Sequence, residues 1–390
     1  MHKISADYIL PVSSAPLKNG VIVIDDDGII ISLSDRNNFE NAELQIYRGI
    51  ICPGFINAHC HLELSYLKEQ ITEHTGLVNF IIEFLSKRDD SGENVQQAIK
   101  DAEDEMIQNG IVGVGDISNA VTSFLQKSKR RIEYHTFVEC LGLLPEKADE
   151  FLDRSIAVFH SAKQLSLEAS ITPHAPYSMS LELMKKIFRL PENQTSIFSY
   201  HNQETAEEND LYTKGTGGFL DFYRKFNFQF IADRIAASSV QAHLNIFPEE
   251  KRILLVHNTF SSKEDIEFVM NKHKNCYWCL CPNANLFIEN TLPDFQNFIT
   301  YNERICLGTD SYASNKGLSI FEEMKTIQQV NPGILTPQLV SWATLNGAEF
   351  FGWNNLGRLE PGKKPGVNLI TNVNAETLQL NKNSIVEKLF

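Results

Sequence analysis

The residues of this sequence that could do chemistry are histidines and acids that follow short apolar runs. His59 and His61 lie at the end of the apolar run 51–58. A spacing of two residues places both imidazoles on one face of a β-strand. Two imidazoles that emerge together can bind a divalent metal, or they can be hydrogen-bonded histidines at the end of a strand. The pair by itself leaves both interpretations open.

Four more residues of this kind occur at the ends of other runs. They are His174, His201, His257 and Asp310. Five of the 11 histidines therefore lie at the predicted carboxyl ends of strands, together with one aspartate. Chance placement explains one such histidine but explains five poorly. The pattern favours a single site built at one edge of the strands.

The elements that must position these residues are short apolar runs separated by helical patterns. Segments 95–109 and 181–190 carry apolar residues at spacings of three and four, which is typical of helices. The predicted strands are 51–58, 111–116, 132–140, 168–172, 195–200, 252–256, 276–281 and 304–308. Eight strands alternating with helices predict an α/β fold with a (β/α)8 TIM-type barrel, and a doubly wound open sheet is the alternative. In such a barrel, functional groups lie at the carboxyl ends of the strands.

The two ends of the chain have a different pattern from its middle. Residues 1–50 contain short β segments around a turn at Asp25-Asp26-Asp27-Gly28, and 354–390 is turn-rich before another strand. We expect both ends to form one small β-sandwich domain, with 1–50 and 354–390 as its two parts. The barrel is expected over 51–353.

Composition excludes several classes of protein. The 390 residues carry 35 Lys and Arg against 49 Asp and Glu, a formal net charge of −14, which argues against a nucleic-acid partner. A single basic run, 127–131, is interpreted as a solvated helix end or loop. No run of about 18 apolar residues predicts a membrane span, and the first residues lack the apolar core of a signal peptide. Seven cysteines fit a reducing compartment, so we expect a cytoplasmic protein.

Motifs along the chain add a resemblance to a known family. Pro53-Gly54-Phe55 leads into His59-Cys60-His61, and the other motifs are 173–178, 201–205, 281–286, 307–311, 343–348 and 359–363. In this order they resemble the amidohydrolase superfamily. The match is greatest to its mononuclear-metal aminohydrolases, which include methylthioadenosine/S-adenosylhomocysteine deaminases, aminodeoxyfutalosine deaminases and chlorohydrolase-like proteins. Ala284 departs from this pattern, because it replaces a usual serine.

The resemblance implies a metal centre. It makes His59, His61, His201 and Asp310 the ligands of one divalent metal ion. Three imidazoles and one carboxylate suit Zn²⁺, with Fe²⁺ as the alternative. Binuclear relatives use a modified lysine at the end of the fourth strand, where this sequence has His174. One metal is therefore expected.

The same resemblance implies roles for the other candidates. Asp310 would take a proton from the attacking water, and His257 would orient that water. Glu204 would pass a proton to a ring nitrogen of the substrate, and His174 would contact the substrate. Glu63, two residues after a predicted ligand, would contact substrate or serve a structural hydrogen bond.

A deaminase of a purine-type ring is the function that the resemblance implies. The substrate would be a small molecule, ranked first as methylthioadenosine, S-adenosylhomocysteine or aminodeoxyfutalosine, and the enzyme would be a homodimer. Guanine deamination, hydrolysis of a cyclic amide as in imidazolonepropionase, and triazine dechlorination use the same metal set. A barrel without catalytic activity that serves in assembly is a further alternative, which the complete ligand set disfavours.

Three segments keep open interpretations. In related deaminases the region of 76–85 covers the pocket and presents an acid to ribose, but Glu83, Asp89 and Asp90 offer no clear match. The stretch 209–230 is interpreted as an ordinary barrel insertion, with a cap over the pocket as the alternative. The cysteines of 276–281 favour a buried strand over a structural zinc site, because a second pair at matching spacing is lacking.

Overall fold

The computed structural model describes residues 1–390 except 89–91, 93, 194–195, 227, 229–235 and 375. Its described centre holds two four-stranded parallel sheets, with strand orders β11-β10-β9-β8 and β12-β13-β14-β15. Each strand falls on a predicted run, and the α/β class is confirmed. The strands are β8 (Phe55–Cys60), β9 (Ile111–Ser118), β10 (Glu133–Cys140), β11 (Glu168–Pro173), β12 (Phe198–Asn202), β13 (Ile253–His257), β14 (Cys276–Leu280) and β15 (Ile305–Leu307).

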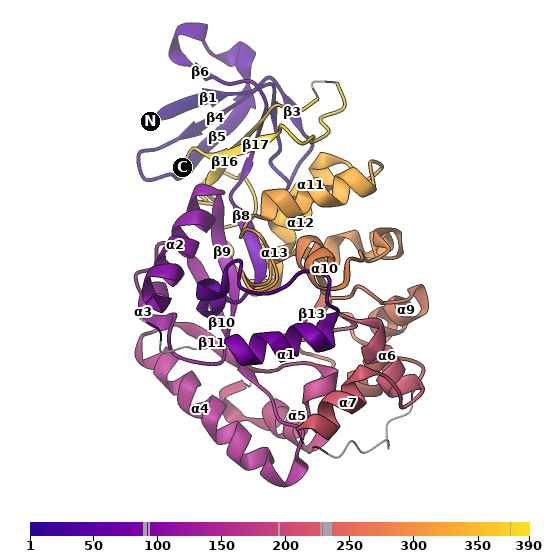
Figure 1. Ribbon diagram of the computed structural model, residues 1–390. Helices are drawn as coiled ribbons and strands as arrows, with labels where there is room; N and C mark the ends of the chain where they lie inside the picture. The colour runs from indigo at the N-terminus through magenta and orange to yellow at the C-terminus, as the bar shows by residue number, and fades with distance from the viewer. Residues whose placement is uncertain (89–91, 93, 194–195, 227, 229–235, 375) are drawn as a thin grey trace.

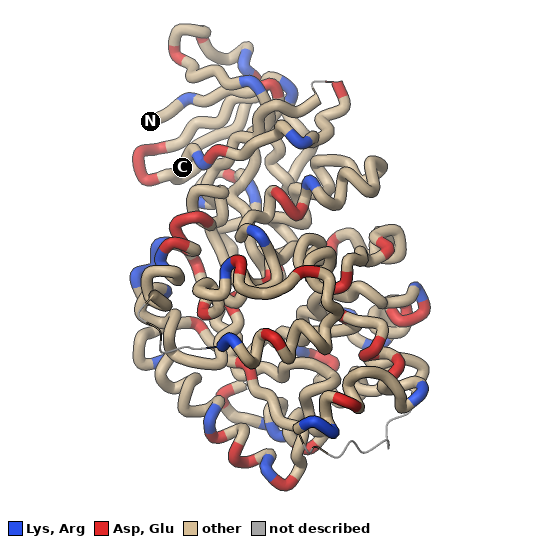
Figure 2. The backbone as a smooth tube through the Cα atoms, in the orientation of Figure 1, with Lys and Arg blue, Asp and Glu red and all other residues tan. Residues whose placement is uncertain are grey.

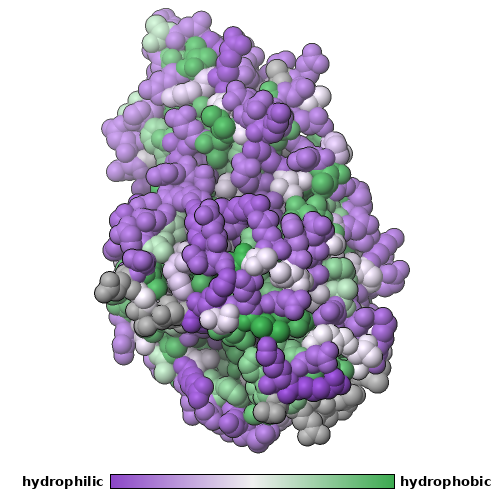
Figure 3. All heavy atoms as spheres, viewed as in Figure 1, coloured by the Kyte–Doolittle hydropathy of each residue, from purple (hydrophilic) through white to green (hydrophobic). Residues whose placement is uncertain are grey.

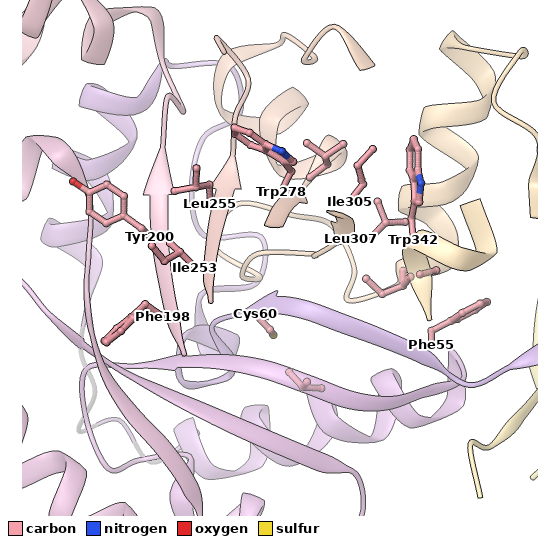
Figure 4. Packing of buried hydrophobic residues seen from close by; sticks show 14 of the residues in the cluster. Phe55, Cys60, Phe198, Tyr200, Ile253, Leu255, Trp278, Ile305, Leu307 and Trp342 are labelled. Atoms are coloured by element: carbon pink, nitrogen blue, oxygen red, sulfur yellow. The ribbon is translucent and has the colours of Figure 1, made fainter. Parts of the chain in front are cut away.

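Both faces of the central strands are buried, which explains why their sequences are apolar without strict alternation. On β13, Ile253 and Leu255 join a cluster that contains residues of the surrounding helices (Figure 4). The intervening Leu254 and Val256 join a second cluster with Phe137 of the other sheet. Alternate residues of β13 therefore pack against the helices on one side and against the opposite sheet on the other.

The two sheets adjoin at both of their edges. At one edge, Cys60 and Asp310 form a parallel bridge between β8 and the residues that follow β15. At the other, the amide N–H of His201 on β12 donates to the carbonyl oxygen of His174, which follows β11, at 2.9 Å. These contacts bring the carboxyl ends of β8, β11, β12 and β15 together. Residues from distant parts of the sequence thereby meet at one edge.

Helices connect the central strands, and several begin at a capping side chain. Ser180, Thr205, Ser238, Ser262 and Ser319 each accept a hydrogen bond from a backbone N–H of the first turn, which satisfies a donor that the helix leaves unpaired. The helices are α1 (Leu77–Lys87), α2 (Val95–Gln108), α3 (Phe124–Lys127), α4 (Ala148–Gln164), α5 (Leu181–Arg189), α6 (Ala206–Thr213), α7 (Gly218–Lys225), α8 (Ser239–His243), α9 (Lys263–Lys272), α10 (Pro282–Glu289), α11 (Ile320–Val330), α12 (Thr336–Ala343) and α13 (Leu345–Phe351). Among the described residues, no helix is long and apolar enough to span a membrane.

Two further sheets are built from both ends of the chain, and the termini lie close to them at one end of the molecule (Figure 1). Their orders are β5-β4-β1-β6 and β17-β16-β7-β2-β3. The two sheets share a hydrophobic cluster that includes Ile22, Ile51 and Leu369. The strands are β1 (His2–Ser5), β2 (Tyr8–Ile9), β3 (Leu17–Lys18), β4 (Gly20–Ile24), β5 (Ile30–Asp35), β6 (Gln45–Ile46), β7 (Ile50–Pro53), β16 (Val367–Thr371) and β17 (Ile385–Lys388).

The predicted strand 51–58 is divided in the structure. Residues up to Pro53 form β7 and pair with β16 of the terminal sheet, whereas β8 begins at Phe55 in the central sheet. Gly54 separates them, and a Cβ atom there would lie 2.8 Å from the carbonyl oxygen of Pro365. A continuous apolar run hides this division, because strands of either sheet need the same residue types.

The basic run 127–131 begins at the end of α3, and residues 129–131 are exposed as the sequence predicted, whereas Lys127 is not solvated. Lys127 ends α3 with its side chain fully buried, and its ammonium group forms an ion pair with the buried carboxylate of Asp116. The other oxygen of Asp116 accepts a hydrogen bond from the backbone N–H of Leu62 at 2.7 Å. Elsewhere, acidic and basic residues are interspersed along the outer helices (Figure 2).

The cysteine-rich run forms β14, and its residues are buried. The cysteines of the chain are free thiols, each of them buried. The interpretation of 276–281 as a buried strand is therefore confirmed.

Candidate active site

The four predicted metal ligands converge at the adjoining edge of the two sheets. Nε2 of His59 lies 3.2 Å from Nε2 of His61, so the shared face expected from their spacing is found. Oδ1 of Asp310 lies 3.5 Å from the first of these atoms and 3.3 Å from the second. The ring centroid of His201 is 4.8 Å from that of His59. Three imidazoles and a carboxylate thus face a common centre.

Hydrogen bonds behind these groups fix their orientation. Nδ1 of His201 lies 3.1 Å from the carbonyl oxygen of His174, so the other ring nitrogen is left for the centre. The hydroxyl of Ser314 donates to Oδ2 of Asp310 at 2.5 Å, which leaves Oδ1 toward the histidines. Asp310 has a φ of 57°, a left-handed backbone conformation that is uncommon outside glycine. Support of this kind is typical of ligand side chains.

His257 ends β13 beside this cluster. Its Nδ1 lies 2.9 Å from Oδ1 of Asn285. Asn285 belongs to the first turn of α10. Nε2 of His257 has no hydrogen-bond partner among the described residues, although Glu204 Oε1 is 3.5 Å away. His257 also has a φ of 72°, a strained conformation that is common at functional sites. A buried ring nitrogen is thereby aimed into the site.

The protonation states expected here suit metal binding. Burial lowers the pKa of His61 to about 3, and it lowers the pKa of His201 well below the ordinary histidine value. Burial alone would raise the pKa of Asp310, but the hydrogen bond from His59 and the neighbouring imidazoles lower that pKa well below its usual range. Neutral imidazoles beside an ionised carboxylate are the forms that bind a divalent cation.

Glu204 is a buried acid held next to the cluster. Burial, followed by the negative charge of Asp310, raises the pKa of Glu204 well above that of an ordinary glutamate. Its position is set by Glu208, whose carboxylate accepts a hydrogen bond from the backbone N–H of Gln203 at 2.8 Å and one from the hydroxyl of Ser239. Glu204 is therefore a carboxyl group that retains its proton to higher pH than usual.

His174 lies in the wall beside His201, with ring centroids 4.8 Å apart. Its Nδ1 is 2.6 Å from the hydroxyl of Ser178, and burial lowers the pKa of His174 to about 3. Its Nε2 lies 3.9 Å from Oε1 of Glu139, the penultimate residue of β10. Sequence reasoning missed Glu139, although its position near the end of a predicted strand was a signal that could have found it.

Glu63 serves the backbone of a neighbouring loop. Its buried carboxylate accepts hydrogen bonds from the N–H groups of Asn119 at 2.9 Å and Ala120 at 3.1 Å. Arg88 Nη2 lies 3.5 Å from Oε1 of Glu63. Burial raises the pKa of Glu63 to about 7. The structural hydrogen bonds considered for Glu63 are present, and a contact of its side chain with substrate stays a prediction.

One end of a cavity of about 370 Å³ is polar. It is lined by His61, Glu139, His174, His201, Glu204, His257 and Asp310. The cavity wall is also lined by apolar side chains of α1, including Phe80 and Phe84, by Phe222 of α7 and by Phe226, the residue that follows α7. Figure 3 shows hydrophobic residues gathered on the surface where Figure 1, in the same view, labels α1. The interpretation of 209–230 as an ordinary insertion is therefore wrong, because α7 contributes to the cavity wall. Phe222 and Phe226 are four residues apart in the sequence, and their ring centroids lie 4.8 Å apart.

Glu83, one of the acids considered near α1, does not line the cavity. The carboxylate of Glu83 accepts hydrogen bonds from Thr72 and Lys87 on the exposed side of the helix. Asp89 and Asp90 lie outside the described residues.

Comparison with known proteins decides the family. The model of the family described as "Amidohydrolase family" matches residues 50–390. This chain belongs to the amidohydrolase family. The membership predicted from the motifs is confirmed, and the match includes every residue of the cluster described above.

Named relatives of this amidohydrolase are deaminases. An adenosine deaminase of Helicobacter pylori is 25% identical over 358 residues, covering 88% of this chain and 86% of that protein. An aminodeoxyfutalosine deaminase of Nitratiruptor sp. is 25% identical over 336 residues, covering 83% and 79%. The structure of Helicobacter pylori aminofutalosine deaminase in complex with methylthio-coformycin has a TM-score of 0.80 at 24% identity, over 96% of this chain and 93% of that chain. That likeness shows a shared fold.

The donor set of this amidohydrolase fits a divalent metal. His59, His61 and His201 offer nitrogens that lie within 4.8 Å of one another, and His59, His257 and Asp310 form a second group of this kind. Imidazole nitrogens that converge in this way can hold one cation through their lone pairs. Three nitrogen donors and one oxygen donor match the preference of Zn²⁺.

Proposed function

We propose that this amidohydrolase removes the amino group from a purine-type ring of an adenosine derivative by hydrolysis. The observation that carries the proposal is Glu204, a buried acid with a raised pKa that lies 3.5 Å from His257 at the metal-binding end of the cavity. Hydrolytic deamination needs a proton donor beside the ring nitrogen and a site for water on the neighbouring carbon. The deaminase relatives support the same reaction.

We assign His59, His61, His201 and Asp310 as the ligands of a single metal ion, with Zn²⁺ favoured over Fe²⁺. A divalent metal held there would lower the pKa of a water molecule to about 7 and so would supply hydroxide near neutral pH. Nδ1 of His201 is already bonded to the carbonyl oxygen of His174, which supports one metal rather than two.

The chain's own side chains would move the protons. Asp310 accepts the proton of the attacking water, and His257 holds that water through Nε2. Glu204 donates its proton to the ring nitrogen beside the carbon that is attacked, which makes that carbon more electrophilic. The amino group then takes the proton accepted by Asp310, and the carbon–nitrogen bond breaks to release ammonia. The ring nitrogen keeps the proton from Glu204, and the proton of the added hydroxyl returns to Glu204 as the ring carbonyl forms.

The cavity supports a substrate with two unlike parts. The polar end accommodates the reacting ring next to His174, and the apolar walls of α1 and α7 accommodate a substituent. Methylthioadenosine, S-adenosylhomocysteine and aminodeoxyfutalosine are ranked first among such substrates. Ammonia release from the zinc-loaded protein with these compounds tests the proposal. If the protein released chloride from a triazine or opened a cyclic amide and released no ammonia, the deaminase proposal would be replaced by that activity.

We further propose that the two central sheets form one closed (β/α)8 barrel over 51–353. The contacts at both edges and the hydrophobic cluster shared between the sheets support this architecture. The terminal sheets would form a small β-sandwich from 1–50 and 354–390, to which residues up to Pro53 contribute β7. A homodimer stays a prediction that sedimentation can test.

A further inference from the structure

One carboxylate in the cavity wall has a free oxygen that the proposed reaction does not use. The side chain of Glu139 is 4% exposed, and its Oε2 accepts a hydrogen bond from Nδ2 of Asn119 at 3.0 Å. Its Oε1 is buried and accepts no hydrogen bond from any residue in the described part of the chain. A buried acceptor left in this state is destabilising, so its presence in a cavity wall indicates a ligand that donates to it.

The position of Glu139 limits what this ligand group can be. Oε1 lies 3.5 Å from Nδ1 of His201 and 3.9 Å from Nε2 of His174. The first nitrogen is already committed to the carbonyl oxygen of His174, whereas Nε2 of His174 faces the cavity. A substrate group that reaches Glu139 therefore lies beside the reacting ring and meets an imidazole nitrogen as well as a carboxylate oxygen.

A hydroxyl group fits this pair. It donates its hydrogen to the carboxylate oxygen, and its own oxygen accepts from the imidazole when Nε2 carries the hydrogen. With the other tautomer, two neighbouring hydroxyls donate to the two acceptors.

Glu139 is a carboxylate of the cavity wall that the proposed reaction does not use. Among the described residues that line the cavity, the carboxylates are Glu139, Glu204 and Asp310, and the last two belong to the proposed reaction. The helix α1 presents apolar side chains to the cavity, and Glu83 is bonded to Thr72 and Lys87 outside it.

We propose that Glu139 recognises a hydroxyl group on the substituent next to the reacting ring, so that the substrate is a hydroxylated, sugar-bearing ring rather than a free base. This inference rests on the proposed function for the orientation of the ring. Glu139 is thereby a specificity-determining residue that contacts substrate through Oε1, with Asn119 holding Oε2.

Glu139→Gln tests the contact because it replaces the acceptor oxygen that faces the cavity with a hydrogen-bond donor. Asn119 donates to Oε2, so a glutamine directs its carbonyl oxygen to Asn119 and its amide NH2 into the cavity. The matched control is Glu83→Gln, the same change on a partly exposed acid of α1 that does not line the cavity. Glu139→Ala serves as a second variant, and the circular dichroism and zinc content of each protein are measured first.

The experiment compares ligands with and without hydroxyls on zinc-loaded protein. Calorimetry measures binding of inosine and 2′,3′-dideoxyinosine, which undergo no deamination, and ammonia release measures kcat/KM for adenosine and 2′,3′-dideoxyadenosine. We expect the wild type and Glu83→Gln to favour the hydroxylated ligand by about 10- to 100-fold in both measurements. Glu139→Gln and Glu139→Ala should reduce that preference to within about threefold, while zinc content stays at one per chain.

Equal binding of the two inosines by the wild type, or no binding of either, would overturn the inference. A preference that survives in both Glu139 variants, or one that Glu83→Gln removes, would also overturn it. So would a second zinc ion that the Glu139 variants lose, since Glu139, His174 and His201 would then be ligands. Discrimination that depends on Glu139 without any ammonia release would instead support the contact and contradict the deaminase function.

Discussion

Nδ1 of His257 lies 2.9 Å from the side-chain oxygen of Asn285, and this contact determines which ring nitrogen of His257 is left for the cavity. An amide oxygen only accepts, so Nδ1 carries the hydrogen and Nε2 keeps its lone pair. Nε2 lies 3.5 Å from Glu204 and is buried without a hydrogen bond from any described residue. Asn285 thus prepares His257 to bind a hydrogen of water.

Replacement of Asn285 by leucine should lower kcat by about 10- to 100-fold, the usual effect of removing a group that orients a site histidine. Both tautomers of His257 then become available, and the ring loses its fixed orientation. Zinc content should not change, because Asn285 contacts none of the four proposed ligands. Kinetics at saturating substrate, together with metal analysis of the same preparation, measure the effect. Unchanged kcat would show that Asn285 does not orient His257.

His61→Ala and Asp310→Ala should each lose zinc and activity together. Each removes one donor from a set in which Nε2 of His61 and Oδ1 of Asp310 are 3.3 Å apart. Equilibrium dialysis followed by elemental analysis measures the stoichiometry, which should fall from one zinc per chain to well below one. His160→Ala, a change at an exposed histidine of α4, is the matched control and should retain both. A variant that keeps its zinc would remove that residue from the ligand set.

Glu204→Gln should keep zinc and the fold but lower kcat by about 10²- to 10⁴-fold, the scale of a general acid–base contribution. The amide has the size of the carboxyl group and cannot transfer its proton to the ring nitrogen. The measurement is kcat with an adenosine derivative, with the melting temperature as the control for folding. Near-native turnover would contradict the proton transfer assigned to Glu204.

The same residue should set the alkaline side of the pH profile. Burial and the charge of Asp310 raise the pKa of Glu204, so the carboxyl group stays protonated at a pH where an ordinary glutamate is ionised. Because the protonated form is the donor, kcat should hold through the acidic range and fall as the pH rises through this raised pKa. In Glu204→Gln the residual activity should lack that decline. A decline of equal size in both proteins would assign it to another group.

The local part of the fold was predictable because strand formation depends on nearby residues. The central strands follow the apolar runs, and His59, His201, His257 and Asp310 lie at or just beyond their carboxyl ends as expected. Parallel strands buried on both faces give continuous apolar sequences that stand out from amphipathic helices. The grouping of the candidate residues follows from this regularity.

Features that depend on distant contacts were not predictable in the same way. The division of 51–58 at Gly54 depends on the approach of Pro365, more than three hundred residues later. The burial of Lys127 depends on Asp116, whose carboxylate supplies the opposite charge. A basic run looks the same in sequence whether its first residue faces solvent or a buried acid, so only the folded arrangement separates the two.

The free oxygen of Glu139 belongs to the same category. Sequence reasoning did not select Glu139, although it lies near the end of a predicted strand. Its role depends on Asn119, which binds one carboxylate oxygen and leaves the other without a hydrogen bond from any described residue. The cavity walls of α1 and α7 are likewise formed by segments far apart in the sequence.

Ammonia release by the zinc-loaded protein tests the central claim most directly. The substrates are methylthioadenosine, S-adenosylhomocysteine, aminodeoxyfutalosine and guanine, with a chelator-treated sample and Glu204→Gln as controls. The account predicts one ammonia per molecule of an adenosine derivative consumed, loss of this activity on chelation, and its recovery when zinc is restored. Protein that contains one zinc per chain and releases no ammonia from any of these adenosine derivatives would contradict it.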